Sequence, residues 1–111
     1  MYMNKIFDKY LLKKDKYVRR RIQIDNSLYE QLSKFTDIYD ASINKLINIA
    51  ILEIINKDDI QLYKRANNEI AEYHNFAIRE TSYRAMEKMK IKYGLSIHKI
   101  VNIAIYNTLN S

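Results

Sequence analysis

The chain repeats itself, and this repetition limits its possible folds more than any other feature. Residues 22–52 align without a gap onto residues 76–106 at a constant offset of 54, and 11 of the 31 aligned pairs are identical. The strongest block, residues 42–51 against 96–105, holds seven identical pairs in ten. Self-similarity at a fixed period is typical of duplicated structural units. We therefore expect two versions of one module, whose differences indicate where function lies.

Each module is too short to bury a stable core alone, so stability must come from association between modules. The chain of 111 residues has no cysteine, and its two histidines, His74 and His98, lack partners at metal-ligand spacing. We therefore expect no metal and no other cofactor. The sequence contains no run of 18 apolar residues and no signal-peptide pattern. These patterns predict a soluble protein in the cytoplasm of a prokaryotic or virus-infected cell, without membrane contact.

The positive charge is concentrated in one window. The net charge is +6, and residues 9–21 hold seven Lys and Arg residues against one acidic residue, so the other 98 residues sum to zero. A local basic focus with a neutral remainder indicates one surface that faces a polyanion. The alternative is a solvated basic tail.

The first module reads as a strand followed by two helices. Residues 18–24 alternate apolar and polar side chains, which predicts a strand with Ile22 and Ile24 on its inner face. The Asp-Asn-Ser sequence at 25–27 supplies N-cap chemistry for a helix whose apolar stripe runs to Tyr39.

The turns between the helices also repeat. Asp40 and Gly94 occupy matching positions after the first helix of each module, where a left-handed backbone often ends a helix. Ser42 and Ser96 then cap the second helices, expected over residues 43–55 and 97–109.

The second helix of each module is apolar nearly all round and must therefore be surrounded by other elements. Ala50 is small enough to let another helix approach closely. The core between paired modules is expected to contain Ile22, Ile24, Leu46, Ile47, Ala50, Ile51, Ile78, Ile100 and Ala104.

These patterns predict a mainly α fold with short β-ribbons and four segments. Arg65 and Glu69, four residues apart, favour a helix between the modules. The segments are a basic amphipathic arm or helix (1–17), module 1 (18–56), a connecting helix (57–72) and module 2 (73–111).

A short strand, two helices and compulsory pairing resemble the ribbon-helix-helix family of DNA-binding proteins, which includes the Arc and MetJ repressors. The resemblance covers residues 19–55 and, with a weaker strand, 76–109. It is carried by Arg-Ile-Gln-Ile at 21–24, by Leu28, Leu32 and Phe35, and by Ser42, Leu46 and Ala50. The tandem arrangement and the bias toward Ile, Lys, Asn and Tyr are also similar to transcription regulators of filamentous archaeal viruses.

The resemblance implies that strands from two modules pair into an antiparallel ribbon whose outward side chains read DNA bases. At the matching positions stand Arg19, Arg21 and Gln23. Their chemistry fits, because Arg can bind guanine and Gln can bind adenine through two hydrogen bonds each. The resemblance also implies that the start of the second helix grips a phosphate. The phosphate-binding set is expected to contain Lys13, Lys14, Lys16, Arg20, Ser42, Asn44 and Lys45.

The second module has lost these reading residues, since the positions that match Arg19, Arg21 and Gln23 hold Tyr73, Asn75 and Ala77. It therefore reads as a pairing platform. Two arrangements are open: a homodimer in which like modules pair between chains, with higher-order assembly on DNA, or a pseudo-dimer within one chain. We favour the homodimer, because it places the basic strand on both sides of the ribbon.

The sequence thus predicts a transcription regulator that binds double-stranded DNA, and a repressor rather than an activator. The alternatives are an architectural or relaxosome-like protein of low sequence specificity, and an antitoxin-like partner-binding module. No acid pair, nucleophile with a base, or glycine-rich phosphate loop occurs at usable spacing, so no enzyme is expected.

Overall fold

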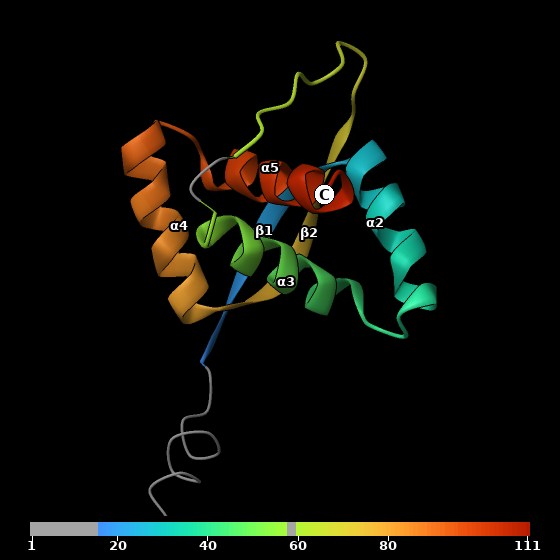
Figure 1. The fold of residues 1–111 in the computed structure, drawn as a ribbon, viewed down its shortest axis with the longest axis horizontal. Coiled ribbons are helices and arrows are strands. Elements are labelled where there is room, and N and C mark those ends of the chain that lie inside the picture. The colour runs from blue at the N-terminus through green and yellow to red at the C-terminus, as the bar shows by residue number, and fades with distance from the viewer. Residues whose placement is uncertain (1–15, 58–59) are drawn as a thin grey trace, which may run out of the picture.

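The computed structural model describes residues 16–57 and 60–111, which form four helices and a two-stranded antiparallel sheet. The order strand-helix-helix occurs twice (Figure 1). The first repeat comprises β1 (Tyr17–Asp25), α2 (Asn26–Ile38) and α3 (Ile43–Ile55), and the second comprises β2 (Ala71–Arg79), α4 (Glu80–Tyr93) and α5 (Ile97–Leu109). The predicted arm, with Lys13 and Lys14, lies outside the described residues except at its last two positions.

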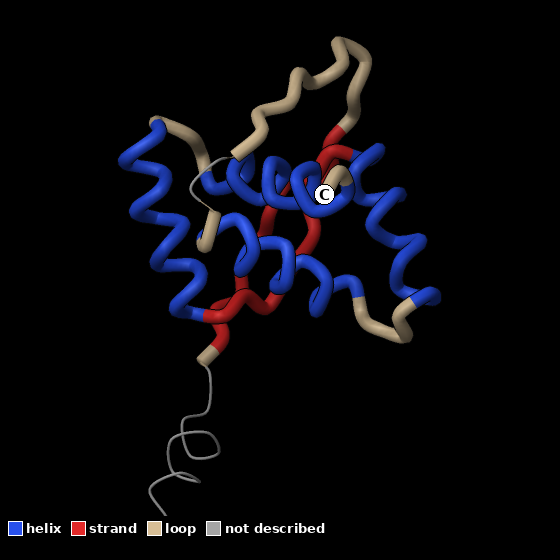
Figure 2. Tube along the Cα trace, viewed as in Figure 1, coloured by secondary structure: helices blue, strands red, loops and turns tan. Residues whose placement is uncertain are grey.

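β1 and β2 pair along their full length in a ribbon. Arg21 lies opposite Asn75, and the ends of the ribbon pair Tyr17 with Arg79 and Asp25 with Ala71. The helices α3 and α5 lie side by side across one face of this ribbon, while α2 and α4 stand at opposite sides (Figures 1 and 2). One face of the ribbon is therefore covered by helices.

The pairing of β1 with β2 lies within one chain, which is the second of the two arrangements that the sequence left open and not the favoured pairing of like modules between chains. The physical reason is that the second repeat supplies everything the first one needs. Its helix α5 packs against α3, with Ala50 and Ala104 both fully buried in one cluster with Ile54 and Ile103. A close approach of two helices at Ala50 was predicted, and the partner helix belongs to the same chain.

The predicted core residues form the core of this single chain. Eight of the nine are at most 1% exposed, and the ninth, Leu46, is partly buried against the same cluster. The inner face of β2 contributes Phe76 and Ile78 beside Ile22 and Ile24 of β1. Alternation along both strands thus buries one face of the ribbon.

The turns follow the predicted geometry. Asp40 and Gly94 both have a left-handed backbone, with φ of 49° and 65°. The Ser42 Oγ accepts a hydrogen bond from the Lys45 amide at 3.1 Å, and the Ser96 Oγ accepts one from the Lys99 amide at the same distance. Both second helices begin and end where the sequence predicted.

The prediction of a connecting helix between the modules is wrong. Among the described residues of the linker (56–70), none is helical, and β2 begins at Ala71. The two residues that favoured a helix make tertiary contacts instead. Arg65 Nε donates to Asp25 Oδ1 at 2.8 Å, and Glu69 Oε1 accepts from the amide and the hydroxyl of Ser27 at 3.0 and 2.6 Å.

The start of α2 is capped in an unexpected way. Asp25 is the N-cap residue, but its side chain makes no capping hydrogen bond. Its carboxylate accepts from the Tyr63 hydroxyl at 2.5 Å and from Arg65, and the free amide of Ser27 is satisfied by Glu69. The linker, rather than the residues before the helix, therefore caps α2.

Candidate nucleic-acid interface

The outer face of the ribbon carries the predicted base-reading residues. Directly opposite residues of an antiparallel pair project from the same face. Arg19 lies opposite Ala77, Arg21 opposite Asn75, and Gln23 opposite Tyr73. We call these six residues the outer ribbon face. Arg19, Arg21, Tyr73 and Asn75 are exposed, whereas Gln23 and Ala77 are half-buried.

Tyr73 holds Arg21 over the opposite strand. The guanidinium carbon of Arg21 lies 4.4 Å from the centroid of the Tyr73 ring, within cation–π range. The same ring meets the His98 ring edge-on, with centroids 6.0 Å apart. Tyr73 thus links the middle of the outer ribbon face to the start of α5. From the sequence alone, Tyr73 was only the position in the second repeat where the first repeat has Arg19.

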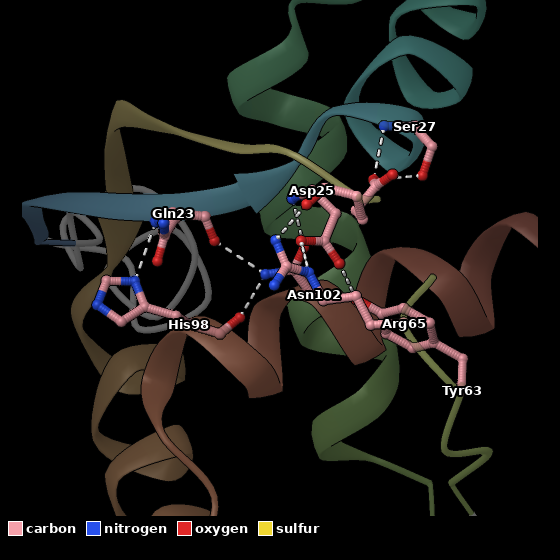
Figure 3. A network of polar contacts seen from close by, with 8 residues as sticks. Gln23, Asp25, Ser27, Tyr63, Arg65, His98 and Asn102 are labelled. Carbon is pink, nitrogen blue, oxygen red and sulfur yellow. Dashed lines mark hydrogen bonds and ion pairs between the residues drawn. The ribbon is translucent and has the colours of Figure 1, made fainter. Parts of the chain in front are cut away.

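The free edge of β1 is closed by two side chains of α5 (Figure 3). The Gln23 amide donates to His98 Nδ1 at 2.9 Å, and the Asp25 amide donates to Asn102 Oδ1 at 2.8 Å. Asn102 Nδ2 in turn donates to the Gln23 carbonyl at 2.9 Å. These contacts place the start of α5 beside the ribbon.

The free edge of β2 is closed in the same way by α3. The Ala77 amide donates to Asn44 Oδ1 at 2.9 Å, and the Arg79 amide donates to Asn48 Oδ1 at 3.0 Å. Each contact lies 54 residues from its counterpart on the other edge, so the internal repeat is also a structural pseudo-symmetry. Asn44, expected at a phosphate, uses both atoms of its amide on Ala77.

The starts of α3 and α5 therefore flank the ribbon, each beside a hollow. The first hollow encloses about 450 Å³ and is lined by Ser42 and Lys45 together with Ala77 of the outer ribbon face. The second encloses about 560 Å³ and is lined by Ser96 and Lys99 together with Gln23. The second hollow differs because the linker residues 62–65 also line it. Two helix starts, each with a lysine, thus stand beside one polar ribbon face.

The basic residues at the beginning of β1 lie near this surface. Lys16 is exposed, and its carbonyl accepts from the Glu80 amide at 2.8 Å. The guanidinium of Arg20 lies 4.8 Å from the ring centroid of Tyr83, and its Nη1 donates to the Arg19 carbonyl. Arg20 thus remains exposed, although alternation along β1 places it on the same face as the buried Ile22 and Ile24.

The linker is fastened to the end of the ribbon by a network around Asp25 (Figure 3). Burial, and then the hydrogen bond to Asp25, raise the pKa of the Tyr63 phenol far above its usual value. The hydrogen bonds from Ser27 lower the pKa of Glu69, which favours its ionised form. Tyr63 also stacks on Tyr106 of α5, with ring centroids 4.9 Å apart.

Sequence reasoning missed the edge-closing side chains, although a signal was present. Asn44, Asn48, His98 and Asn102 are polar residues in otherwise apolar helices, spaced by four in each helix. Residues four apart lie on the same face of a helix, so each pair can contact one strand.

No helix in the described part of the chain is long and apolar enough to cross a membrane. The described residues also hold no group of three or more His, Cys, Asp or Glu side chains that could bind a metal ion. Comparisons of the chain with protein-family models, with curated proteins and with solved structures find no match.

Proposed function

We propose that the protein is a sequence-specific DNA-binding transcription regulator that inserts the β1–β2 ribbon into the major groove. The observation that carries the proposal is the outer ribbon face, where Arg19, Arg21 and Gln23 project from one side of a ribbon whose other side is buried. The major groove admits a two-stranded ribbon, and Arg and Gln are the side chains that bind guanine and adenine through paired hydrogen bonds.

The repeated strand-helix-helix order supports membership of the ribbon-helix-helix family in tandem form. In this proposal the two helix starts bind phosphates on either side of the groove. Backbone amides at a helix start attract anions, and Lys45 and Lys99 add positive charge there. Ser42 contributes as the cap that holds the first turn in place. Such contacts position the protein without reading sequence. Lys16 and Arg20 extend the basic surface at the beginning of β1.

We favour repression over activation. A ribbon that fills the major groove of a promoter needs no further surface to exclude polymerase. Activation would require a surface that recruits another protein, and the outer ribbon face is already assigned to DNA in this proposal.

The proposal is tested by footprinting on fragments of the source genome, at near-physiological salt and with excess competitor DNA. A short protected site is expected. Uniform protection that competitor DNA abolishes would instead indicate phosphate-dominated binding of low specificity, which falls steeply with salt.

A pair of variants locates the reading surface. Arg21→Ala is expected to reduce binding to the protected site by at least about fivefold while leaving binding to random DNA nearly unchanged, because a bidentate base contact contributes about 1–3 kcal/mol of discrimination. Lys90→Ala is the matched control, since it removes one positive charge from the last turn of α4. Equal losses on specific and random DNA in Arg21→Ala would contradict the assignment.

A further inference from the structure

We infer that one chain is the complete reading unit and that its DNA site is asymmetric, without two-fold symmetry. This inference rests on the proposed function and specifies the kind of duplex that the ribbon reads. The inference follows from the different residues that β1 and β2 carry on the outer ribbon face.

The ribbon has a two-fold pseudo-axis in its backbone but not in its side chains. The offset of 54 relates Arg21 to Asn75, and these two residues lie directly opposite each other. The pseudo-axis therefore passes through this pair. It relates Arg19 to Tyr73 and Gln23 to Ala77, so every pair that symmetry would make equal is chemically different.

The two strands consequently favour different bases. β1 offers two guanidinium groups and a carboxamide, which suit guanine and adenine edges. On β2, Asn75 suits adenine and the methyl group of Ala77 suits the methyl group of thymine. Because Arg19 lies opposite Ala77, these two residues share one half of the site, which favours guanine beside a thymine methyl group. Gln23 and Tyr73 share the other half, where the carboxamide favours adenine.

A second chain is not needed to complete the ribbon. The Gln23 and Asp25 amides and the Gln23 carbonyl bond to side chains of α5. The Ala77 and Arg79 amides and the Ala77 carbonyl bond to side chains of α3, so the C-terminal end of each free edge cannot accept another strand. The apolar faces of α3 and α5 cover each other within the chain, and Ala50 and Ala104 are fully buried there. The features that make pairing between chains obligatory in a single module are thus satisfied internally.

The test is selection of binding sites from random duplexes with the wild-type chain and with a symmetrised variant. The variant Tyr73→Arg, Asn75→Arg and Ala77→Gln gives both strands the residues of β1. The first two positions are exposed, and the third takes the residue of its own counterpart, Gln23. Circular dichroism and the urea midpoint confirm that the variant folds before selection.

The wild-type chain is expected to select a site without two-fold symmetry, bound by one chain per duplex in sedimentation equilibrium. The symmetrised variant is expected to select an inverted repeat of the guanine-containing half-site. It should bind that repeat at least about fivefold more tightly than the wild-type chain does, which is the lower limit for one bidentate base contact. The reverse variant, Arg19→Tyr, Arg21→Asn and Gln23→Ala, should lose the guanine-containing half of the selected site.

The outcomes separate the inference from the proposed function. A palindromic wild-type site, or two chains on the shortest duplex that binds, would overturn the inference while the proposed function stands. Failure of all three proteins to enrich any sequence would overturn the proposed function, and the inference with it.

Discussion

Asn48 and Asn102 stand at equivalent positions of the two repeats and make the same three hydrogen bonds. Each Oδ1 accepts from an amide of the strand in the other repeat, at 3.0 Å from Arg79 and at 2.8 Å from Asp25. Each Nδ2 donates to a carbonyl of that strand and to the carbonyl four residues earlier in its own helix. The helix of one repeat therefore holds the strand of the other, which makes the two repeats one folding unit.

Replacing Asn102 with alanine should destabilise the fold substantially. The residue is 6% exposed, and its loss leaves the Asp25 amide and the Gln23 carbonyl without partners. An unsatisfied buried polar group costs about 1–3 kcal/mol, so we expect a loss of about 2–4 kcal/mol in urea unfolding followed by circular dichroism. Asn110→Ala is the control, because Asn110 is exposed and its side chain donates to the Tyr106 carbonyl within its own helix. Equal stability of the two variants would contradict the role of Asn102.

Local signals in the sequence predicted the helices well. Asp40 and Gly94 set the turns, and Ser42 and Ser96 set the helix starts, because these effects depend on a few neighbouring residues. The outward placement of the arginines followed from alternation along the strand.

Properties that depend on tertiary contacts could not be predicted in the same way. An apolar helix face looks the same whether its partner belongs to another chain or to the same one, so the sequence left pairing within the chain as one of two alternatives. Arg65 and Glu69 have helical spacing, but Asp25 and Ser27 offer better partners in the folded chain. The role of Tyr73 depends on Arg21, which comes near it only through strand pairing.

Because of the linker, two isoleucines at equivalent positions of the repeats should contribute unequally to the stability of the fold. Ile103 is 5% exposed, in a cluster packed against Ile60 and Tyr63, whereas its counterpart Ile49 is 50% exposed. We expect Ile103→Ala to cost about 2–4 kcal/mol, because it removes buried methyl groups and leaves a cavity. Ile49→Ala should cost less than about 1 kcal/mol, as is usual at half-exposed positions. Equal costs in urea unfolding would show that the linker does not protect Ile103.

The burial of Tyr63 and its hydrogen bond to Asp25 should make the fold sensitive to alkaline pH. The folded state raises the pKa of Tyr63, so it holds the phenolic proton more tightly than the unfolded chain. The resulting stabilisation is complete below the unfolded pKa of about 10 and is lost progressively as the pH rises above it. We therefore expect the urea midpoint of the wild-type chain to fall more steeply above about pH 10 than that of Tyr63→Phe.

The phenylalanine variant also provides the control at neutral pH. It lacks the hydrogen bond to the Asp25 carboxylate and should be less stable there by about 1–2 kcal/mol. Parallel pH profiles for the two proteins would show that the phenol carries no pH-dependent stability.

The start of α3 should contribute to DNA affinity without contributing to specificity. Lys45 is exposed beside the hollow that borders the outer ribbon face, and its own amide is already capped by Ser42. If its ammonium neutralises a phosphate, Lys45→Ala should reduce the slope of log K against log salt by about 0.9. Specific and random duplexes should be affected alike, because a phosphate contact carries no sequence information. Lys90→Ala removes the same charge from the last turn of α4 and should leave the slope unchanged. A change in slope for both variants would mean that net charge, rather than a contact at the start of α3, governs the salt dependence.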